Sequence, residues 1–204
     1  MTKKPIVGFL FFSKLLYNLL WVRLMKKYCE LISKSLIDFE EIKMILANNN
    51  VLLLSGYQAK ERVFLKNGIS LLNANYKTII DNSLTISEVD DKKFLFYTTG
   101  EKYNKESSKI EIVNESECEE FLNHIGYKEQ FVVDSDRYIY SDGNNYLYVT
   151  NLANIGLYVG VRKENANEEE LKEILSSFDI PYDEEVCDES MERLFVNKLR
   201  RQMK

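Results

Sequence analysis

Residues 83–113 read SLTISEVDDKKFLFYTTGEKYNKESSKIEIV, and this stretch decides the fold. Ser83–Ser87 and Phe94–Thr98 are rich in β-branched and aromatic residues, which are typical of strands. The pair Asp90-Asp91 lies between them, and aspartate is a common turn residue. The stretch therefore predicts two antiparallel strands joined as a hairpin.

The second half of this stretch predicts a further strand. Residues 101–107 are polar and are expected to form a loop. Lys109–Val113 then alternates strictly, so Lys109 and Glu111 share one face of a strand while the isoleucines occupy the other. Such alternation is typical of an antiparallel sheet with only one face buried.

The rest of the chain continues the pattern of strands interrupted by a few helices, so we predict an α+β fold. Asp38 is a candidate N-cap, and Pro181 is expected to interrupt the chain. Strands are expected at 29–36, 51–54, 62–65, 76–80, 131–140, 146–150 and 157–162, with a turn at 55–56, and helices at 38–47, 116–124, from 167 and from 188.

The composition predicts a globular protein and excludes several functional classes. The formal net charge of −5 argues against a nucleic-acid-binding surface, which needs a basic patch. Three scattered cysteines without a CxxC motif argue against a disulfide framework and favour the cytoplasm. The single histidine, His124, lies on a predicted helix, which argues against a zinc site or a Ser-His-Asp triad.

The first 24 residues differ from the rest, so we divide the chain into an apolar N-terminal extension, 1–24, and a domain, 25–200. The run at 6–22, IVGFLFFSKLLYNLLWV, is shorter than the roughly 20 residues of a bilayer span and contains Lys14. Three interpretations stay open: a helix docked on the domain, a helix in peripheral contact with a membrane, or an extension absent from the functional protein.

Five short segments in one order carry a resemblance to a known family. The segments are Ser83–Ser87, Phe94–Gly100, Ile125–Tyr127, Asn154–Val159 and Ser190–Leu194. In this order they resemble the landmarks LRIR, TYKG, LGF, GLGxFxE and SYxEL of the CYTH family, the triphosphate tunnel metalloenzymes, which include class IV adenylate cyclases and thiamine triphosphatases. The resemblance covers about residues 25–196 and implies an eight-stranded, mostly antiparallel tunnel barrel with helices packed outside.

The family's chemistry implies which residues to examine. In the family, lysines and arginines inside the barrel bind triphosphate oxygens, while carboxylates hold Mg²⁺ or Mn²⁺. On the matching positions of this chain, Lys34, Lys109 and Arg137 are the implied anion-binding residues, and Glu30 and Glu111 are the implied metal ligands. An alternative interpretation is that these five residues form buried ion pairs inside the barrel.

Most of the other matching positions lack the family's charged residue. Ile32, Thr150, Gly160 and Arg162 stand where the resemblance implies metal-side acids. Small polar residues replace four phosphate-side bases, and these are Thr85, Ser87, Thr99 and Ser135. Glu88, Asp134 and Asp136 are reserve acids if the strand register shifts by one residue.

This pattern predicts a degenerate, non-enzymatic relative that retains at most weak binding of polyphosphate or nucleotide anions and needs no cofactor. One alternative is an active triphosphatase or adenylate cyclase with a rearranged site, which would require Mg²⁺ or Mn²⁺. The other alternative is an unrelated α+β interaction module. A convergence of at least four carboxylates inside the barrel would favour the enzyme.

Overall fold

The structure, a computed structural model, describes residues 26–89, 91–101, 104–188 and 191–202. The predicted extension 1–24 and its apolar run 6–22 lie outside these residues. The strands are β1 (Lys26–Ser35), β2 (Leu52–Lys66), β3 (Ser83–Val89), β4 (Lys92–Glu101), β5 (Asn104–Ile112), β6 (Tyr127–Ser141), β7 (Tyr146–Leu152), β8 (Gly156–Lys163) and β9 (Tyr182–Asp188). The helices are α2 (Phe39–Asn48), α3 (Tyr76–Asp81), α4 (Glu115–His124), α5 (Glu168–Ser176) and α6 (Met191–Gln202).

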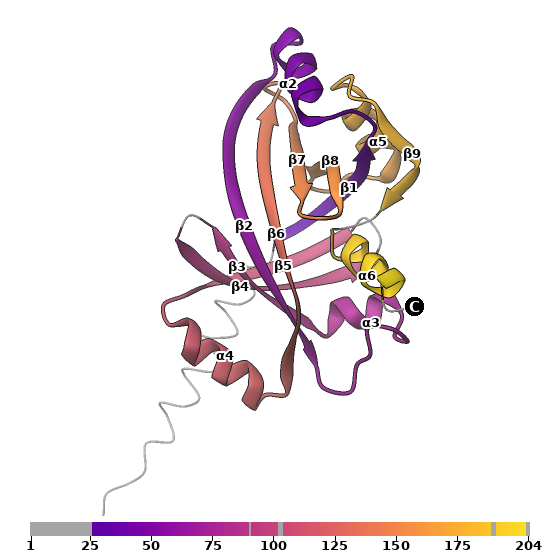
Figure 1. The fold of residues 1–204 in the computed structure, drawn as a ribbon. Coiled ribbons are helices and arrows are strands. Elements are labelled where there is room, and N and C mark those ends of the chain that lie inside the picture. Colours follow the sequence, from indigo (N-terminus) through magenta and orange to yellow (C-terminus); the bar gives the residue numbers. More distant parts are fainter. Residues whose placement is uncertain (1–25, 90, 102–103, 189–190, 203–204) are drawn as a thin grey trace, which may run out of the picture.

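Eight of these strands close into an antiparallel barrel, as predicted. They follow the order β5-β4-β3-β2-β6-β7-β8-β1, and β1 pairs back onto β5. The closing seam is short and runs from Lys26 opposite Ser107 to Cys29 opposite Asn104. The long strands β2 and β6 lie side by side along the molecule, and β9 adds to β1 beyond the barrel (Figure 1).

The helices cover the outside of the barrel and bury the outward-facing side chains of its strands. The largest core lies between β1, β7 and β8 on one side and α2 and α5 on the other, with Leu31, Val159 and Leu171 among its fully buried members. A second core packs Leu122 of α4 against Phe64 of β2. Because side chains alternate along a strand, these contacts leave the neighbouring residues facing the barrel interior.

Two helices pack together where β2 ends and β3 begins. Ile79 of α3, Val196 of α6 and Leu65 of β2 share one buried cluster. Arg200 of α6 donates hydrogen bonds to the backbone carbonyl oxygens of Leu71 and Ala74, in the loop before α3. Figure 1 shows α3 and α6 as neighbours on this side of the barrel.

Several local predictions were wrong. Residues 76–80 form helix α3 rather than a strand, because the Asn75 side chain accepts a hydrogen bond from the Thr78 amide and caps a helix there. The predicted turn at 55–56 is a register shift within the continuous strand β2. Most of the predicted loop 101–107 belongs to β5, which begins at Asn104.

The segment after Pro181 also differs from the prediction, because it forms strand β9 along β1. Cross-strand pairing with β1 stabilises it.

No helix within the described part of the chain is long and apolar enough to cross a membrane.

Candidate functional site

The barrel encloses a tunnel cavity of about 240 Å³. Seven of the eight barrel strands contribute to its wall. The lining residues are Tyr28, Glu30, Tyr57, Glu61, Val63, Thr85, Ser87, Val89, Phe96, Thr98, Ser107, Phe131, Val133, Arg137 and Arg162. A smaller cavity of about 90 Å³ adjoins it and shares Glu30, Tyr57, Arg137 and Arg162 with it. The tunnel is therefore the candidate site within the described part of the barrel.

Arg162 and Glu30 form the first of two ion pairs in the tunnel. The Arg162 Nε donates to Glu30 Oε1 at 3.1 Å, and Nη2 donates to the same oxygen. The guanidinium lies 4.2 Å from the ring centre of Tyr28 and 5.2 Å from that of Tyr148. Burial is the largest single influence on the pKa of Arg162 and lowers it, but the charge and hydrogen bond of Glu30, together with Tyr28 and Tyr148, raise the pKa above its ordinary value, so Arg162 stays a cation.

Arg137 and Glu61 form the second pair. The Arg137 Nη2 lies 2.7 Å from Glu61 Oε2, and its Nε donates to Ser135 Oγ at 3.0 Å. Both pairs are partly buried, with 12% of the Glu30 side chain and 21% of the Glu61 side chain exposed. Each tunnel carboxylate thus has an arginine as its partner, and the four charges sum to zero.

The residues of this tunnel do not fit the Mg²⁺ or Mn²⁺ that the resemblance implies. Such a cation needs several oxygen ligands around one point. In this tunnel the Arg162 guanidinium is hydrogen-bonded to the Glu30 carboxylate, and its positive charge would repel a metal cation there. Within residues 26–89, 91–101, 104–188 and 191–202, no three His, Cys, Asp or Glu residues converge closely enough to hold a metal.

The backbone at Gly160 explains why an acid cannot simply occupy this position of β8. A Cβ atom at this position would lie 2.8 Å from the Leu31 carbonyl oxygen and 2.9 Å from Ile32 Cγ1. Real Cβ atoms essentially never approach other atoms below 3.0 Å. The close approach of β8 to β1 therefore requires glycine at this position.

The structure brings together two of the five residues named from the resemblance. Glu30 and Arg137 both line the tunnel. Lys34 on β1 is exposed, and so are Lys109 and Glu111 on β5. The Lys109 ammonium lies 4.9 Å from the centre of the Phe94 ring. None of these three is among the residues that line the two tunnel cavities.

Two charged residues near the tunnel were not predicted from the sequence. Glu61 lies in the middle of β2, and only the pairing of β2 with β6 brings it within reach of Arg137, which is four residues along β6 from Val133, the register partner of Glu61. Lys105 was expected in a loop, but it is paired with Tyr28 across the barrel seam and is only 2% exposed. Its Nζ has no hydrogen-bond partner and lies 5.6 Å from the ring centre of Tyr76. Strand alternation within 104–113 would have revealed Lys105.

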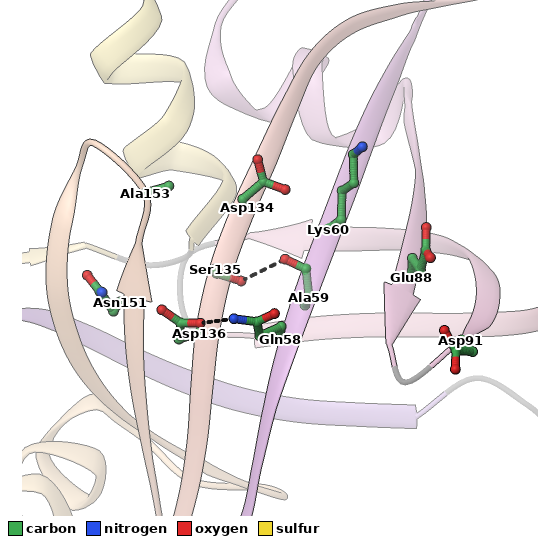
Figure 2. Close-up of a pocket in the computed structure, with 10 residues that line it drawn as sticks. All are labelled: Gln58, Ala59, Lys60, Glu88, Asp91, Asp134, Ser135, Asp136, Asn151 and Ala153. Atoms are coloured by element: carbon green, nitrogen blue, oxygen red, sulfur yellow. Dashed lines mark hydrogen bonds between the residues drawn. The ribbon is translucent and has the colours of Figure 1, made fainter.

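A larger groove of about 830 Å³ lies apart from the ion pairs, beside β2 and β6 (Figure 2). The reserve acids Glu88, Asp134 and Asp136 line it, together with Asp91 and Lys60. Figure 2 shows the Gln58 amide donating to Asp136 across the two strands, at 3.1 Å. These acids are therefore absent from the tunnel lining, and a register shift does not bring them there.

Comparisons with known proteins support the fold. No protein-family model matches the sequence, and no curated protein matches it either. A structure of a Pyrococcus horikoshii protein matches with a TM-score of 0.64 and 15% identity, covering 85% of this chain and 99% of that one. A candidate adenylate cyclase from Vibrio parahaemolyticus matches with a TM-score of 0.63 and 13% identity, covering 83% and 98%.

A third match is a candidate adenylyl cyclase from Hippeastrum, described as having a dominant triphosphatase activity. Its TM-score is 0.55 at 14% identity, and the match covers 87% of this chain and 96% of that one. These likenesses bear out the predicted resemblance: the chain has a CYTH-like, adenylate cyclase-like tunnel fold. At such low identity they establish the fold and not an activity.

Proposed function

We propose that the protein is a non-catalytic CYTH-fold binding protein whose tunnel retains at most weak affinity for polyphosphate or nucleotide anions. The Arg162–Glu30 pair is the observation that carries this proposal. Arg162 stands at a position where the resemblance implies a metal-binding acid, and it bonds to one of the acids that remain. Catalysis of phosphoryl transfer in this family depends on a metal that neutralises developing charge, and the tunnel no longer provides for one.

Weak anion binding follows from the balance of charges. Arg137 is bonded to Glu61, so a phosphate group would compete with a carboxylate for it. The ammonium of Lys105 is buried without a hydrogen-bond partner and contributes a positive field near the seam. Lys34 and Lys109 are exposed, so their attraction for an anion is screened by salt.

The first test is enzymatic. We expect the purified protein with Mg²⁺ or Mn²⁺ to hydrolyse or cyclise ATP, tripolyphosphate or thiamine triphosphate no faster than a protein-free control. The reason is the lack of a carboxylate cluster in the tunnel. Turnover that disappears in Glu30→Gln or Glu111→Gln would refute the proposal and favour a rearranged active enzyme.

The second test measures anion binding by thermal shift. At low ionic strength, tripolyphosphate at ten times its Kd should stabilise the folded state by about 1.4 kcal/mol, which corresponds to a Tm rise of about 3–6 °C. Added salt should remove the rise. The triple variant Lys34→Ala, Lys109→Ala, Arg137→Ala should abolish it.

A matched control removes the same number of positive charges elsewhere on the surface. It replaces the exposed Lys66, Lys128 and Lys172 with alanine. The control should keep most of the Tm rise, because it leaves in place Arg137, the tunnel cation for which a phosphate group would compete. If both triple variants lose the Tm rise equally, tripolyphosphate binding depends only on the net charge of the protein.

We also propose a cytoplasmic protein that contacts membranes peripherally through the apolar run at 6–22. The basic residues Lys3, Lys4 and Arg23 flank this run and would favour an anionic lipid surface. Co-sedimentation with vesicles containing phosphatidylserine should retain the full chain and lose a variant that begins at Met25. Equal recovery of both forms in the supernatant would refute membrane contact.

A further inference from the structure

One wall of the tunnel presents hydroxyl groups that the protein does not use. Thr85 and Ser87 lie on β3, Thr98 lies on β4, and Ser107 lies opposite Thr98 on β5. Among the described residues, none of these four hydroxyls has a hydrogen-bond partner, although the barrel wall satisfies their backbones. A hydroxyl can both donate and accept, so this wall offers hydrogen bonds of either direction to a molecule in the tunnel.

The rest of the wall is aromatic and aliphatic. Phe96 lies between the hydroxyls, and Tyr57 and Phe131 line other parts of the cavity. Aromatic side chains favour flat ligands, which stack against a ring or meet its edge. Val63 and Val133 add apolar surface. This lining is typical of small-molecule sites, which are mostly apolar with a few polar groups that orient the ligand.

The charges in the tunnel do not favour a charged ligand. Arg137 and Arg162 each bond to a glutamate, at 2.7 Å for the first pair and through two nitrogens for the second. A polyanion would have to displace a carboxylate from its arginine, which would leave that carboxylate partly buried without a partner. Lys105 does not line the cavity, so its ammonium offers a ligand no direct contact.

The volume limits the size of the ligand. The cavity of about 240 Å³ lies just below the roughly 300–1,000 Å³ that drug-sized ligands occupy. The adjoining space of about 90 Å³ reaches Thr150 and Tyr148. A single or fused ring, alone or with one substituent no larger than a pentose, matches the two spaces together.

We infer that the tunnel binds an uncharged, flat, hydrogen-bonding molecule of nucleobase or nucleoside size in preference to a polyphosphate. The inference deepens the proposed function, since it rests on the tunnel being a binding site without catalysis. The unpartnered hydroxyls orient the ligand, the aromatic rings contact its faces, and the two ion pairs disfavour a charged ligand. This site therefore favours an uncharged ligand, whereas the family's sites bind the highly charged triphosphate.

The test uses ligand-observed NMR on the full chain at physiological salt. Adenine, adenosine and thymidine are the uncharged probes, and tripolyphosphate and ATP are their charged counterparts. We expect saturation transfer to the ring protons of at least one uncharged probe, with an affinity at least tenfold above that for tripolyphosphate. Tighter binding of tripolyphosphate, or no binding of any uncharged probe, would overturn the inference.

Two sets of variants locate the binding. Thr85→Val with Thr98→Val removes two hydroxyls at nearly constant volume and should weaken the uncharged probe about tenfold, since each net hydrogen bond changes an affinity by about 2–12-fold. The control Thr78→Val makes the same replacement on α3, away from the tunnel lining, and should leave binding unchanged. Equal effects in both variants would place the probe outside the tunnel.

Glu61→Gln removes the charge that neutralises Arg137, so it should raise tripolyphosphate affinity at least tenfold in a salt-dependent manner. Glu88→Gln changes the net charge equally in the outer groove and should not. An equal gain in both variants would refute the role of the ion pair. Triphosphate turnover by the wild type would end the proposed function, whereas a non-catalytic protein that ignores all uncharged probes would end only this inference.

Discussion

Replacing Gly160 with alanine tests the geometry that separates this tunnel from a metal site. Gly160 lies on β8 opposite Ile32 of β1, and an added Cβ would lie 2.8 Å from the Leu31 carbonyl oxygen. The backbone of β1 cannot yield freely, because β1 also pairs with β9 and packs against α5. The two strands must therefore separate locally to admit one methyl group.

Overpacking of this kind costs about 1–3 kcal/mol in a well-packed interior. We expect Gly160→Ala to lower the free energy of unfolding by about 2 kcal/mol. For a chain of this length that corresponds to a fall in Tm of about 4–8 °C. Gly160→Glu would introduce the acid that the resemblance implies at this position and should cost more, since it adds a partly buried charge to the same clash.

Chemical denaturation measures the effect directly, with circular dichroism to confirm the fold. Gly56→Ala is the matched control, because its Cβ would meet only the Tyr138 ring, at 3.0 Å, and that side chain can move. The control should stay within about 1 kcal/mol of the wild type. If Gly160→Ala is as stable as the wild type, the close approach of β1 and β8 does not exclude a side chain, and the argument against a restored acid fails.

Three further predictions concern the outside of the barrel. Arg62→Met should cost about 2–3 kcal/mol by denaturant melt, because Arg62 joins β2 to Glu115 and two other glutamates, which would then repel one another. The hydrogen bond from Lys93 lowers the pKa of Glu115 in the folded state. The stabilising contribution of Glu115 is therefore complete above its unfolded pKa of about 4.5 and is lost as the pH falls below that value. Glu115→Gln should flatten the dependence of Tm on pH between about 5 and 3. Asp38→Ala removes a capping box with Glu41 and should cost about 1 kcal/mol, and a change below about 0.3 kcal/mol would contradict the cap.

The candidate site was predictable only in part. Glu30 and Arg137 were named from the order of apolar landmarks, and both line the tunnel. Glu61 was missed because nothing in its local sequence distinguishes an inward glutamate from an exposed one. Lys105 was missed because the polar residues 101–107 are typical of a loop, and only their pairing with β4 and β1 makes residues 104–107 part of a strand. The resemblance therefore identified charged tunnel residues only at positions that match the family's own charged positions.

The sequence by itself determined the α+β class and the antiparallel hairpins. These features depend on residue type and on alternation along one segment, which are local properties. Helix α2 was predicted for the same reason, since Asp38 caps it through adjacent residues.

Only the tertiary structure decided how the remaining charges are used. The pairing of β1 with β8 places Arg162 on Glu30, and the pairing of β2 with β6 places Arg137 near Glu61. Both partners lie far apart in the chain, so no local pattern could join them. Strand β9 likewise exists because β1 offers it an edge, and α3 formed where strand-like residues met a capping asparagine. Long-range pairing sets the register, and the register determines which side chains share the tunnel.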